Sequence, residues 1–369
     1  MVSLTADRWG GSYWAMPFAH RASAKGLLPE HWDEAWSRGW FRMRQSVFTT
    51  HFLEFDRKIF SALWLRVGLK RWSFDHKFLE LKKRNARFRV EIHPADPEGP
   101  SADDEALYRI YRESLSFQPA PTLTDLLVGS DLDSEIPTWQ IDLFDADARI
   151  ASGYFDLGPT AAAGISSFYD PKYRKHSLGK YLIYLKMEFC QGRGRQYFYP
   201  GYIAPGDSRF DYKRSMGAAV LEYLDLTSGT WVPLPSGPFS DPLSLMAERL
   251  EFLQVLLKTK GFEPEVFRNL HLDINLNPQI QGMGLFDYPV FLDCVPTGDQ
   301  APNLVVVFDP RIRQYHLFQC RSVYRFADLE SEPGVFESDL LLVERNLFST
   351  PEGQEMAACL QGFQLVTES

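Results

Sequence analysis

Residues 197–214 of this 369-residue chain gather side chains that could bind a polar ligand. The segment holds three tyrosines in six residues, two Pro-Gly breaks, and then Asp207, Ser208 and Arg209 in succession. An aromatic run with so many polar tips predicts a strand, Tyr197 to Tyr199, that opens into a loop. Loops held by a rigid strand are where binding groups collect. The alternative is an edge strand whose tyrosines face water.

The preceding segment predicts the elements that must position these side chains. Gly164 to Pro171 is a strand that leaves into a turn, and Lys172 to Lys175 is a charged loop. Ser177 is a suitable N-cap for a helix from Leu178 to about Gln191. The apolar stripe of that helix is Leu178, Tyr181, Leu182, Leu185 and Phe189. Strand, loop, helix and strand in this order make a crossover unit if the two strands are parallel.

These residues resemble the signature region of the arginyl-tRNA–protein transferases. The similar stretches are GISSFYDP, SLGKYLIYLKMEF and YFYPGYIAPGDSRFDYKR, where the family has a Ser-Ser strand, an SLG helix start, a Y-x-x-GY strand and a YK close. The resemblance extends from about Gly39 to Val232. It implies a fold similar to that of the GNAT acetyltransferases. It also implies transfer of an amino acid, with arginine as the first candidate, from charged tRNA to the N-terminal amine of a protein or peptide.

The implied reaction asks mainly for positioning. An aminoacyl ester is already activated, and an α-amine with an unperturbed pKa of about 7.7–8.0 is partly neutral near pH 7. Holding two reactants together can contribute about 7–11 kcal/mol. The protein must also stabilise an oxyanion and pass a proton to the leaving ribose oxygen. We therefore expect no metal and no cofactor, with aminoacyl-tRNA as the co-substrate.

The resemblance implies four catalytic residues. Ser166 and Ser167, at a strand end, would offer donors near the reacting carbonyl, or are two small residues in tight packing. Tyr202 would shape the amino-acid pocket or stack on the terminal adenine of the tRNA. Asp207 would hold a cationic side chain or the incoming amine, or is a turn-forming aspartate after Gly206.

A second set of residues would bind the substrates. Tyr199 would share the role of Tyr202 or pack on a face of the sheet. Arg209 stands where the family has Lys, and Tyr212 and Lys213 match its YK and would meet the acceptor end of the tRNA. The substrate-binding candidates are Tyr169, Tyr199, Ser208, Arg209, Tyr212 and Lys213.

Basic segments supply candidates for tRNA contacts on a chain whose formal net charge is −9. Bases outnumber acids between Arg66 and Arg89, and a second basic stretch runs from Lys172 to Lys186. In the family the element matching Lys82 to Asn85 lies near the acceptor arm, where Lys and Arg add affinity without sequence choice. The candidates are Lys82, Lys83, Arg84, Arg174, Lys175 and Lys180. A solvated helix face is the alternative.

Composition predicts a cytoplasmic protein without a membrane segment. Hydrophobic residues make up 45% of the chain, but no apolar run approaches the roughly 18 residues of a membrane span, and no signal-peptide pattern is apparent. The four cysteines are widely spaced, which indicates reduced thiols instead of disulfides or a zinc site. Members of the family carry N-terminal cysteines linked to redox control or an iron–sulfur cluster. No cysteine precedes Cys190 here, so we expect no cluster.

The order of elements predicts an α+β protein in three parts. A basic, tRNA-facing domain would occupy residues 1–95, a GNAT-like mixed sheet flanked by helices 96–235, and an accessory α+β domain 242–369. In the first part we expect a helix at about Lys58 to Leu69. In the last part we expect a helix from Ser244 to about Gly261, and strands from Asn303 to Phe308 and from Gln314 to Tyr324 that form a hairpin.

Two other functions stay open from the sequence. One is a coenzyme A–dependent acetyltransferase, although the segment from Arg174 to Lys180 has one glycine where a pyrophosphate loop would have more. The other is a GNAT-like module that binds RNA or protein without catalysis. Retention of tRNA with steep salt dependence would favour aminoacyl transfer, and retained acetyl-CoA would favour acetylation. The sequence names neither the acceptor nor the oligomeric state.

Overall fold

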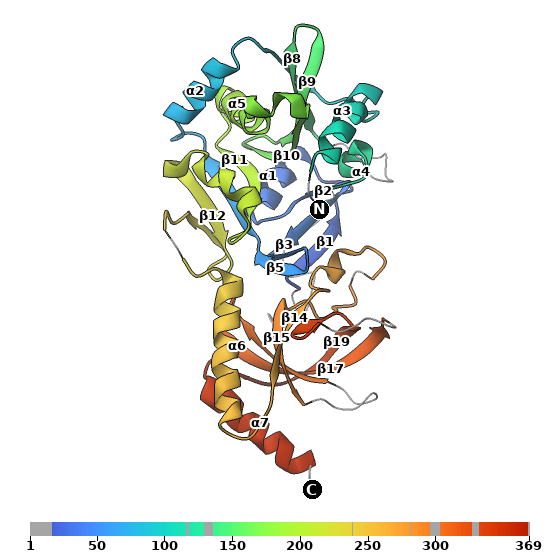
Figure 1. The fold of residues 1–369 in the computed structure, drawn as a ribbon, viewed down its shortest axis with the longest axis vertical. Coiled ribbons are helices and arrows are strands. Elements are labelled where there is room, and N and C mark those ends of the chain that lie inside the picture. The colour runs from blue at the N-terminus through green and yellow to red at the C-terminus, as the bar shows by residue number, and fades with distance from the viewer. Residues whose placement is uncertain are drawn as a thin grey trace.

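The computed structural model describes residues 17–367, apart from 116, 118, 129–135, 238, 281, 296–302 and 327–331. An eight-stranded sheet and a six-stranded sheet dominate the fold. Figure 1 shows the two sheets at different heights along the long axis, with the six-stranded sheet near the C-terminal end. The expected α+β class is confirmed. The expectation that no iron–sulfur cluster is present concerns an N-terminal region outside the described residues.

The eight-stranded sheet is mixed, with the order β13-β12-β6-β11-β10-β9-β8-β7. Its neighbouring strands are antiparallel except for β10 and β11, which are parallel. Strands β6 and β7 come from before residue 95, so the sheet crosses the position where we expected a domain boundary. The strands are β6 (Leu63–Gly68), β7 (Arg89–Pro94), β8 (Thr138–Asp145), β9 (Ala148–Leu157), β10 (Ala161–Tyr169), β11 (Tyr197–Ile203), β12 (Leu221–Asp225) and β13 (Thr230–Pro233).

Helices cover both faces of this sheet because its strands bury alternate residues on each side. Leu65 and Phe198 pack on the face covered by α2 (His76–Arg84) and α5 (Leu178–Gly192). Trp64 and Tyr199 pack on the other face. The elements on that face are α1 (Pro29–Ser37), α3 (Ala102–Glu113), α4 (Leu123–Leu127) and the small sheet of β1 (Ala19–Ser23), β2 (Phe41–Met43) and β3 (Ser46–Thr50).

The crossover that the sequence predicts is present as β10, α5 and β11. The helix predicted from Leu178 to about Gln191 is confirmed by α5, and the parallel pairing of its two strands by their register. The expected capping role of Ser177 is wrong. This residue precedes α5 with a left-handed backbone (φ 52°), and its side chain makes no capping hydrogen bond.

The expected helix at Lys58 to Leu69 is also wrong, because this segment forms two strands. Strand β5 (Lys58–Ser61) pairs with β4 (Phe52–Phe55), and β6 lies between β11 and β12. Leu63, Leu65 and Val67 are buried on one face of β6, with Trp64 buried on the other. A strand buried on both faces shows no simple alternation, so its apolar run resembles that of a buried helix.

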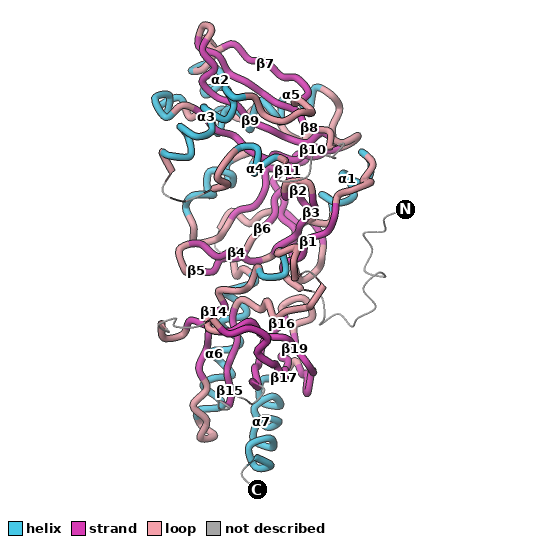
Figure 2. The backbone as a smooth tube through the Cα atoms, turned by 90° about the vertical axis from the view of Figure 1, so that its right-hand side faces the viewer, coloured by secondary structure: helices cyan, strands magenta, loops and turns pink. Residues whose placement is uncertain are grey.

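The C-terminal part packs α6 (Pro242–Lys258) and α7 (Gly353–Thr367) on the six-stranded sheet, as Figure 2 also shows. The helix expected at Ser244 is confirmed by α6, whose cap is Asp241, and the expected hairpin is confirmed by the antiparallel pair β16 and β17. The strands are β14 (Glu265–Asn269), β15 (Val290–Val295), β16 (Asn303–Asp309), β17 (Gln314–Arg325), β18 (Val335–Phe336) and β19 (Asp339–Thr350).

No helix among the described residues is long and apolar enough to cross a membrane. No group of three or more His, Cys, Asp or Glu side chains among these residues could hold a metal ion.

Candidate active site

Strands β10 and β11 separate in the middle of the large sheet. The two strands pair at three positions, the last of which joins Ala163 and Tyr199. Beyond them β10 bulges between Gly164 and Ser166, and β11 is irregular between Phe198 and Gly201. Pro200 has no N–H to donate, and Gly201 takes a positive φ of 89° that favours glycine. The two strands therefore stop pairing where β10 has a bulge and where β11 contains Pro200 and Gly201.

Two adjoining pockets flank this separation. The larger, about 430 Å³, has an aromatic wall formed by Phe41, Phe48, Trp64, Tyr202 and Phe210. The smaller, about 110 Å³, is lined by Ser166, Ser167, Ile183, Lys186, Phe198 and Tyr212. Gly164, Ile165, Pro200 and Lys213 line both pockets. The larger pocket suits an apolar or aromatic group. A polar group in either pocket could reach the residues that line both, which form the shared wall.

Lys213 is the charged side chain at the junction of the two pockets. It lies on the 3₁₀ segment η4 (Ser208–Ser215), and its Nζ donates a hydrogen bond to the carbonyl oxygen of Tyr202 at 2.8 Å. It forms no ion pair in the described part of the chain. Burial lowers the pKa of Lys213 to about 8. An amine with such a pKa can both hold and release a proton near neutral pH.

The two candidate serines have different environments. The Nζ of Lys186, on α5, donates to the Ser167 hydroxyl at 3.0 Å and to the Ser166 backbone carbonyl at 2.6 Å. Successive side chains of a strand point to opposite faces, so the Ser167 hydroxyl is the one on the α5 face. Ser166 meets Lys186 through its main chain.

The candidate tyrosines also differ. Tyr202 lines the larger pocket, half-buried, with its ring 5.1 Å from that of Trp64. Tyr199 is 1% exposed, packs against Trp36 and Phe41, and lines neither pocket. Tyr199 therefore packs on a face of the sheet, which was the alternative to a role in substrate binding.

Asp207 and Arg209 are paired with each other. The buried Asp207 carboxylate accepts bonds from the backbone N–H of Arg209 at 3.0 Å and from its guanidinium at 2.6 Å. Arg209 holds the pKa of Asp207 below its usual value. Neither residue lines either pocket, so the pair stabilises the start of η4.

The remaining substrate-binding candidates lie around the same segment. Ser208 is exposed at the start of η4, and the exposed Tyr212 lines the smaller pocket. Tyr169 lies at the end of β10, half-buried, with its ring 5.2 Å from that of Tyr111. Only Tyr212 and Lys213 of η4 therefore reach the smaller pocket, and Tyr169 lies outside both pockets.

The tRNA-binding candidates come together from two parts of the sequence. Arg84 donates to the carbonyl oxygen of Lys175 at 3.4 Å, so the end of α2 lies beside η3 (Pro171–His176). Lys83, Arg84, Arg174 and Lys175 are exposed there. Lys82 pairs with Glu188 at 2.5 Å. Lys180 donates to the Ser215 hydroxyl at 2.8 Å, which connects this basic surface to the end of η4.

Sequence reasoning missed Lys186, which we had counted with an exposed basic stretch. The side chain is 1% exposed. One signal could have found it, since Lys186 follows Leu182 by four residues and so falls on the apolar face of α5.

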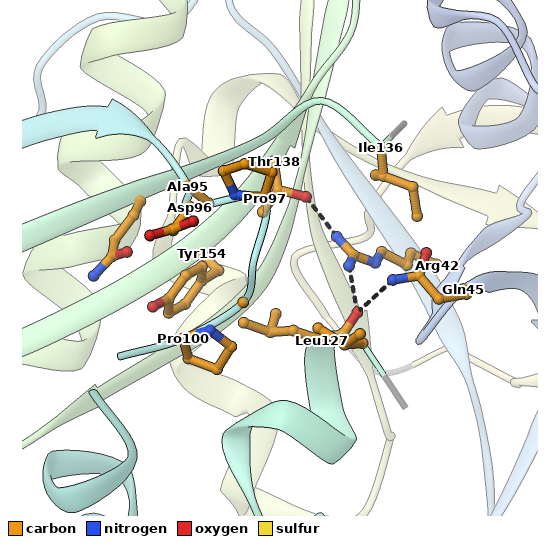
Figure 3. Close-up of a pocket in the computed structure, with 13 residues that line it drawn as sticks. Arg42, Gln45, Ala95, Asp96, Pro97, Pro100, Leu127, Ile136, Thr138 and Tyr154 are labelled. Carbon is orange, nitrogen blue, oxygen red and sulfur yellow. Dashed lines mark hydrogen bonds between the residues drawn. The ribbon is translucent and has the colours of Figure 1, made fainter. Parts of the chain in front are cut away.

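Arg42 was missed as well. It donates to Thr138 at 2.7 Å and to the buried Asp156 at 2.9 Å. Asp156 and Arg42 line the larger pocket, and Arg42 also lines a third pocket of about 400 Å³. Figure 3 shows Arg42 in that third pocket, between Thr138 and Leu127. No spacing in the sequence connects Arg42, on the three-stranded sheet, with Thr138 and Asp156 on the eight-stranded sheet.

The part of the chain that forms this site is similar to known transferases. A model of the family described as "Arginine-tRNA-protein transferase, C terminus" matches residues 92–222, which include β10, α5, β11 and η4. The resemblance stated from the sequence is confirmed over this range.

Two curated relatives illustrate the similarity. An aspartate/glutamate leucyltransferase from Ruegeria sp. (strain TM1040) is 27% identical over 150 residues, which are 40% of this chain and 52% of the relative. Arginyl-tRNA–protein transferase 1 from Saccharomyces cerevisiae is 32% identical over 95 residues, which are 26% of this chain and 18% of the relative. The chain thus spans about half or less of these relatives. Among solved structures, L-PGS from Bacillus licheniformis gives a TM-score of 0.28 at 14% identity, over 38% of this chain and 46% of that one.

Proposed function

We propose that this protein is an aminoacyl-tRNA–dependent transferase that moves an amino acid from charged tRNA to the N-terminal amine of a protein or peptide. The observation that carries the proposal is the buried Lys213 at the junction of two pockets, inside the segment that matches the family. Arginine stays our first candidate for the transferred amino acid, and the name of the Ruegeria relative makes leucine the second.

The arrangement around β10 and β11 supports a GNAT-like fold for this part of the chain. A parallel pair joined by α5 ends its pairing halfway, and a pocket opens on each side. An extended substrate can enter such an opening from both faces of the sheet. We propose that the aminoacyl end of the tRNA and the acceptor amine meet there.

The pocket linings suggest how the substrates are held. The aromatic wall of the larger pocket, with Tyr202, would take the side chain of the transferred amino acid. The ester carbonyl would then lie near the shared wall, and the smaller pocket with Ser167 would face the oxyanion. We assign Asp207 no substrate contact in this arrangement, because its carboxylate already binds Arg209.

Lys213 would carry the proton that the reaction must move. The neutral amine of the acceptor forms the new C–N bond at the ester carbonyl, and the C–O bond to the ribose breaks. The Lys213 ammonium gives a proton to the leaving ribose oxygen and recovers one from the attacking nitrogen. A pKa of about 8 suits both transfers near neutral pH.

The basic surface next to η4 would hold the acceptor stem. Lys83, Arg84, Arg174 and Lys175 are exposed together, and Lys180 connects them to η4. Their contacts with phosphates would be independent of sequence and sensitive to salt. With such a partner we also propose a cytoplasmic location, where charged tRNA is found.

Transfer from individually charged tRNAs to peptides with different N-terminal residues tests the function. We expect product with one or a few amino acids, and tRNA binding that weakens with salt by a log–log slope of roughly −0.7 to −0.9 per phosphate contacted. Absence of transfer with every charged tRNA, together with acetylation from acetyl-CoA, would replace this proposal by the acetyltransferase.

A further inference from the structure

Lys186 is a buried amine whose three N–H groups are all used. Its Nζ donates to the carbonyl oxygen of Tyr154 at 3.0 Å, to that of Ser166 at 2.6 Å and to the Ser167 hydroxyl at 3.0 Å. Three acceptors match the three donors of an ammonium group. Within the described residues Lys186 forms no ion pair, so nothing neutralises its charge.

The surrounding backbone leaves room for this ammonium. A Cβ on Gly153 would lie 2.8 Å from the Lys186 Nζ and 2.9 Å from the Ser166 carbonyl oxygen. The helix contributes one further titratable group, the buried Cys190, while the groups that contact Nζ from β9 and β10 are neutral oxygens. Burial lowers the pKa of Lys186 to about 7. A buried ammonium without a counter-ion destabilises a fold, which makes a functional role worth testing.

The hydrogen bond from Lys186 determines what the Ser167 hydroxyl can do. A hydroxyl has one hydrogen to donate and two lone pairs that accept. Because Oγ accepts from Lys186, its hydrogen is available for another oxygen, and the described residues provide no acceptor for it. Ser167 lines the smaller pocket, where the proposed reaction would develop negative charge.

We propose that Lys186 is a positioning residue that holds the Ser167 hydroxyl as a hydrogen-bond donor for the oxyanion of the transfer reaction. The inference rests on the proposed function and adds to it a role that Lys213 does not have. Lys213 would move a proton. Lys186, which also lines the smaller pocket, has its three N–H groups engaged and would act on the oxyanion through the Ser167 hydroxyl. While Lys186 is protonated, its positive charge would strengthen the donor, because electrostatic interactions are strong where water is excluded.

A double-mutant cycle tests this coupling. We expect Ser167→Ala and Lys186→Met each to lower kcat by about 10²-fold, the usual cost of losing one oxyanion donor, with KM for charged tRNA within about threefold. The double variant should be no slower than the slower single variant, because both changes remove the same donor. Multiplying effects would overturn the proposal, since Lys186 would then act independently of Ser167.

The control is Cys190→Ala, one turn further along α5. Cys190 is buried but lines neither pocket, so this variant tests a general disturbance of the helix and should keep kcat. If Lys186→Met fails to fold, Lys186→Gln replaces it in the cycle. Ser167→Ala alone also tests the proposal. A wild-type kcat in that variant would rule out the Ser167 hydroxyl as an oxyanion donor, and with it the role of Lys186.

Two different failures can be told apart. If the wild-type protein transfers no amino acid from any charged tRNA, the proposed function itself fails. If the wild type transfers and Ser167→Ala does so equally fast, only the role of Lys186 and Ser167 fails.

Discussion

Two buried charged sites, one beside each large sheet of this protein, differ in how their charge is compensated. In the eight-stranded sheet, Lys186 and Lys213 are buried beside β10 and β11 and form no ion pair in the described part of the chain. In the six-stranded sheet, the buried Asp309 accepts bonds from Nε of Arg311 at 2.9 and 3.1 Å, from its Nη2 at 2.6 Å, and from the Tyr288 hydroxyl. Charge is left uncompensated at the two lysines beside β10 and β11, whereas it is neutralised at the Asp309–Arg311 pair.

The strands beside these two charged sites also differ in how far they stay paired. Strands β16 and β17 stay in register from Asn303 with Cys320 to Asp309 with Gln314. Strands β10 and β11 lose their register after Ala163 and Tyr199, and the two lysines line the pockets that open there. We interpret a neutralised pair between two strands in register as a structural feature, and the unpaired ammonium groups where two strands separate as the candidate site for a ligand.

The largest effect should come from Lys213→Met. We expect transfer to fall by about 10²-fold or more, because a positioned acid–base group typically contributes 10²–10⁴-fold, while tRNA binding changes little. Steady-state kinetics with charged tRNA and filter binding measure the two quantities. Lys258→Met removes an exposed lysine of α6 and serves as the control. Full activity in the Lys213 variant would end its role in proton transfer.

In the six-stranded sheet, Asp309→Asn should cost stability instead of activity. The change leaves Arg311 buried without its carboxylate, for which we expect a loss of about 3 kcal/mol in the free energy of unfolding. Glu344→Gln is the matched control, because it breaks the exposed pair with Arg321 on the same sheet and should cost less than about 1 kcal/mol. Urea denaturation measures both, and equal losses would contradict a structural role of the buried Asp309–Arg311 pair.

The uncompensated charge of Lys186 should make stability depend on pH. Its pKa is about 7 in the folded protein and 10.5 as the ordinary value. Between these values the unfolded chain holds a proton that the folded protein has released, so this group's contribution to stability rises with pH. Below pH 7 the destabilisation is complete.

Lys186→Met removes this dependence. Relative to the variant, the wild type should gain about 3 kcal/mol in the free energy of unfolding between pH 6 and pH 9. Urea denaturation at the two pH values measures the change, with Lys258→Met as a variant in which none is expected. A wild-type-minus-variant difference that is equal at both pH values would show that Lys186 stays protonated.

The smallest effects should come from the basic surface. Arg84→Ala and Lys175→Ala should each weaken tRNA binding by about two- to fivefold and reduce the salt slope by about one contact, because each removes one phosphate partner. Neither should change the pH dependence of stability, which separates this exposed surface from the buried lysines. Binding measured across a salt series decides, and an unchanged slope would remove these residues from the tRNA interface.

Local patterns in the sequence predicted α5, α6, the hairpin of β16 and β17, and the resemblance over residues 92–222. These features depend on neighbours in the chain, such as the apolar stripe from Leu178 to Phe189 and the motif at Tyr212 and Lys213. The strand at Leu63 to Gly68 was predicted as a helix because its partners, β11 and β12, lie about 130 residues away or more. Tertiary pairing decided its conformation.

The amino-acid sequence determined by itself which side chains are available near β10 and β11, and that a helix joins the two strands. Only the tertiary structure decided which of them share a pocket. It paired Asp207 with Arg209, buried Tyr199, and brought Lys186 from α5 against Ser167 of β10. Burial and charge compensation depend on everything packed around a group, so residue types alone could not distinguish a buried, unpaired lysine from a solvated one.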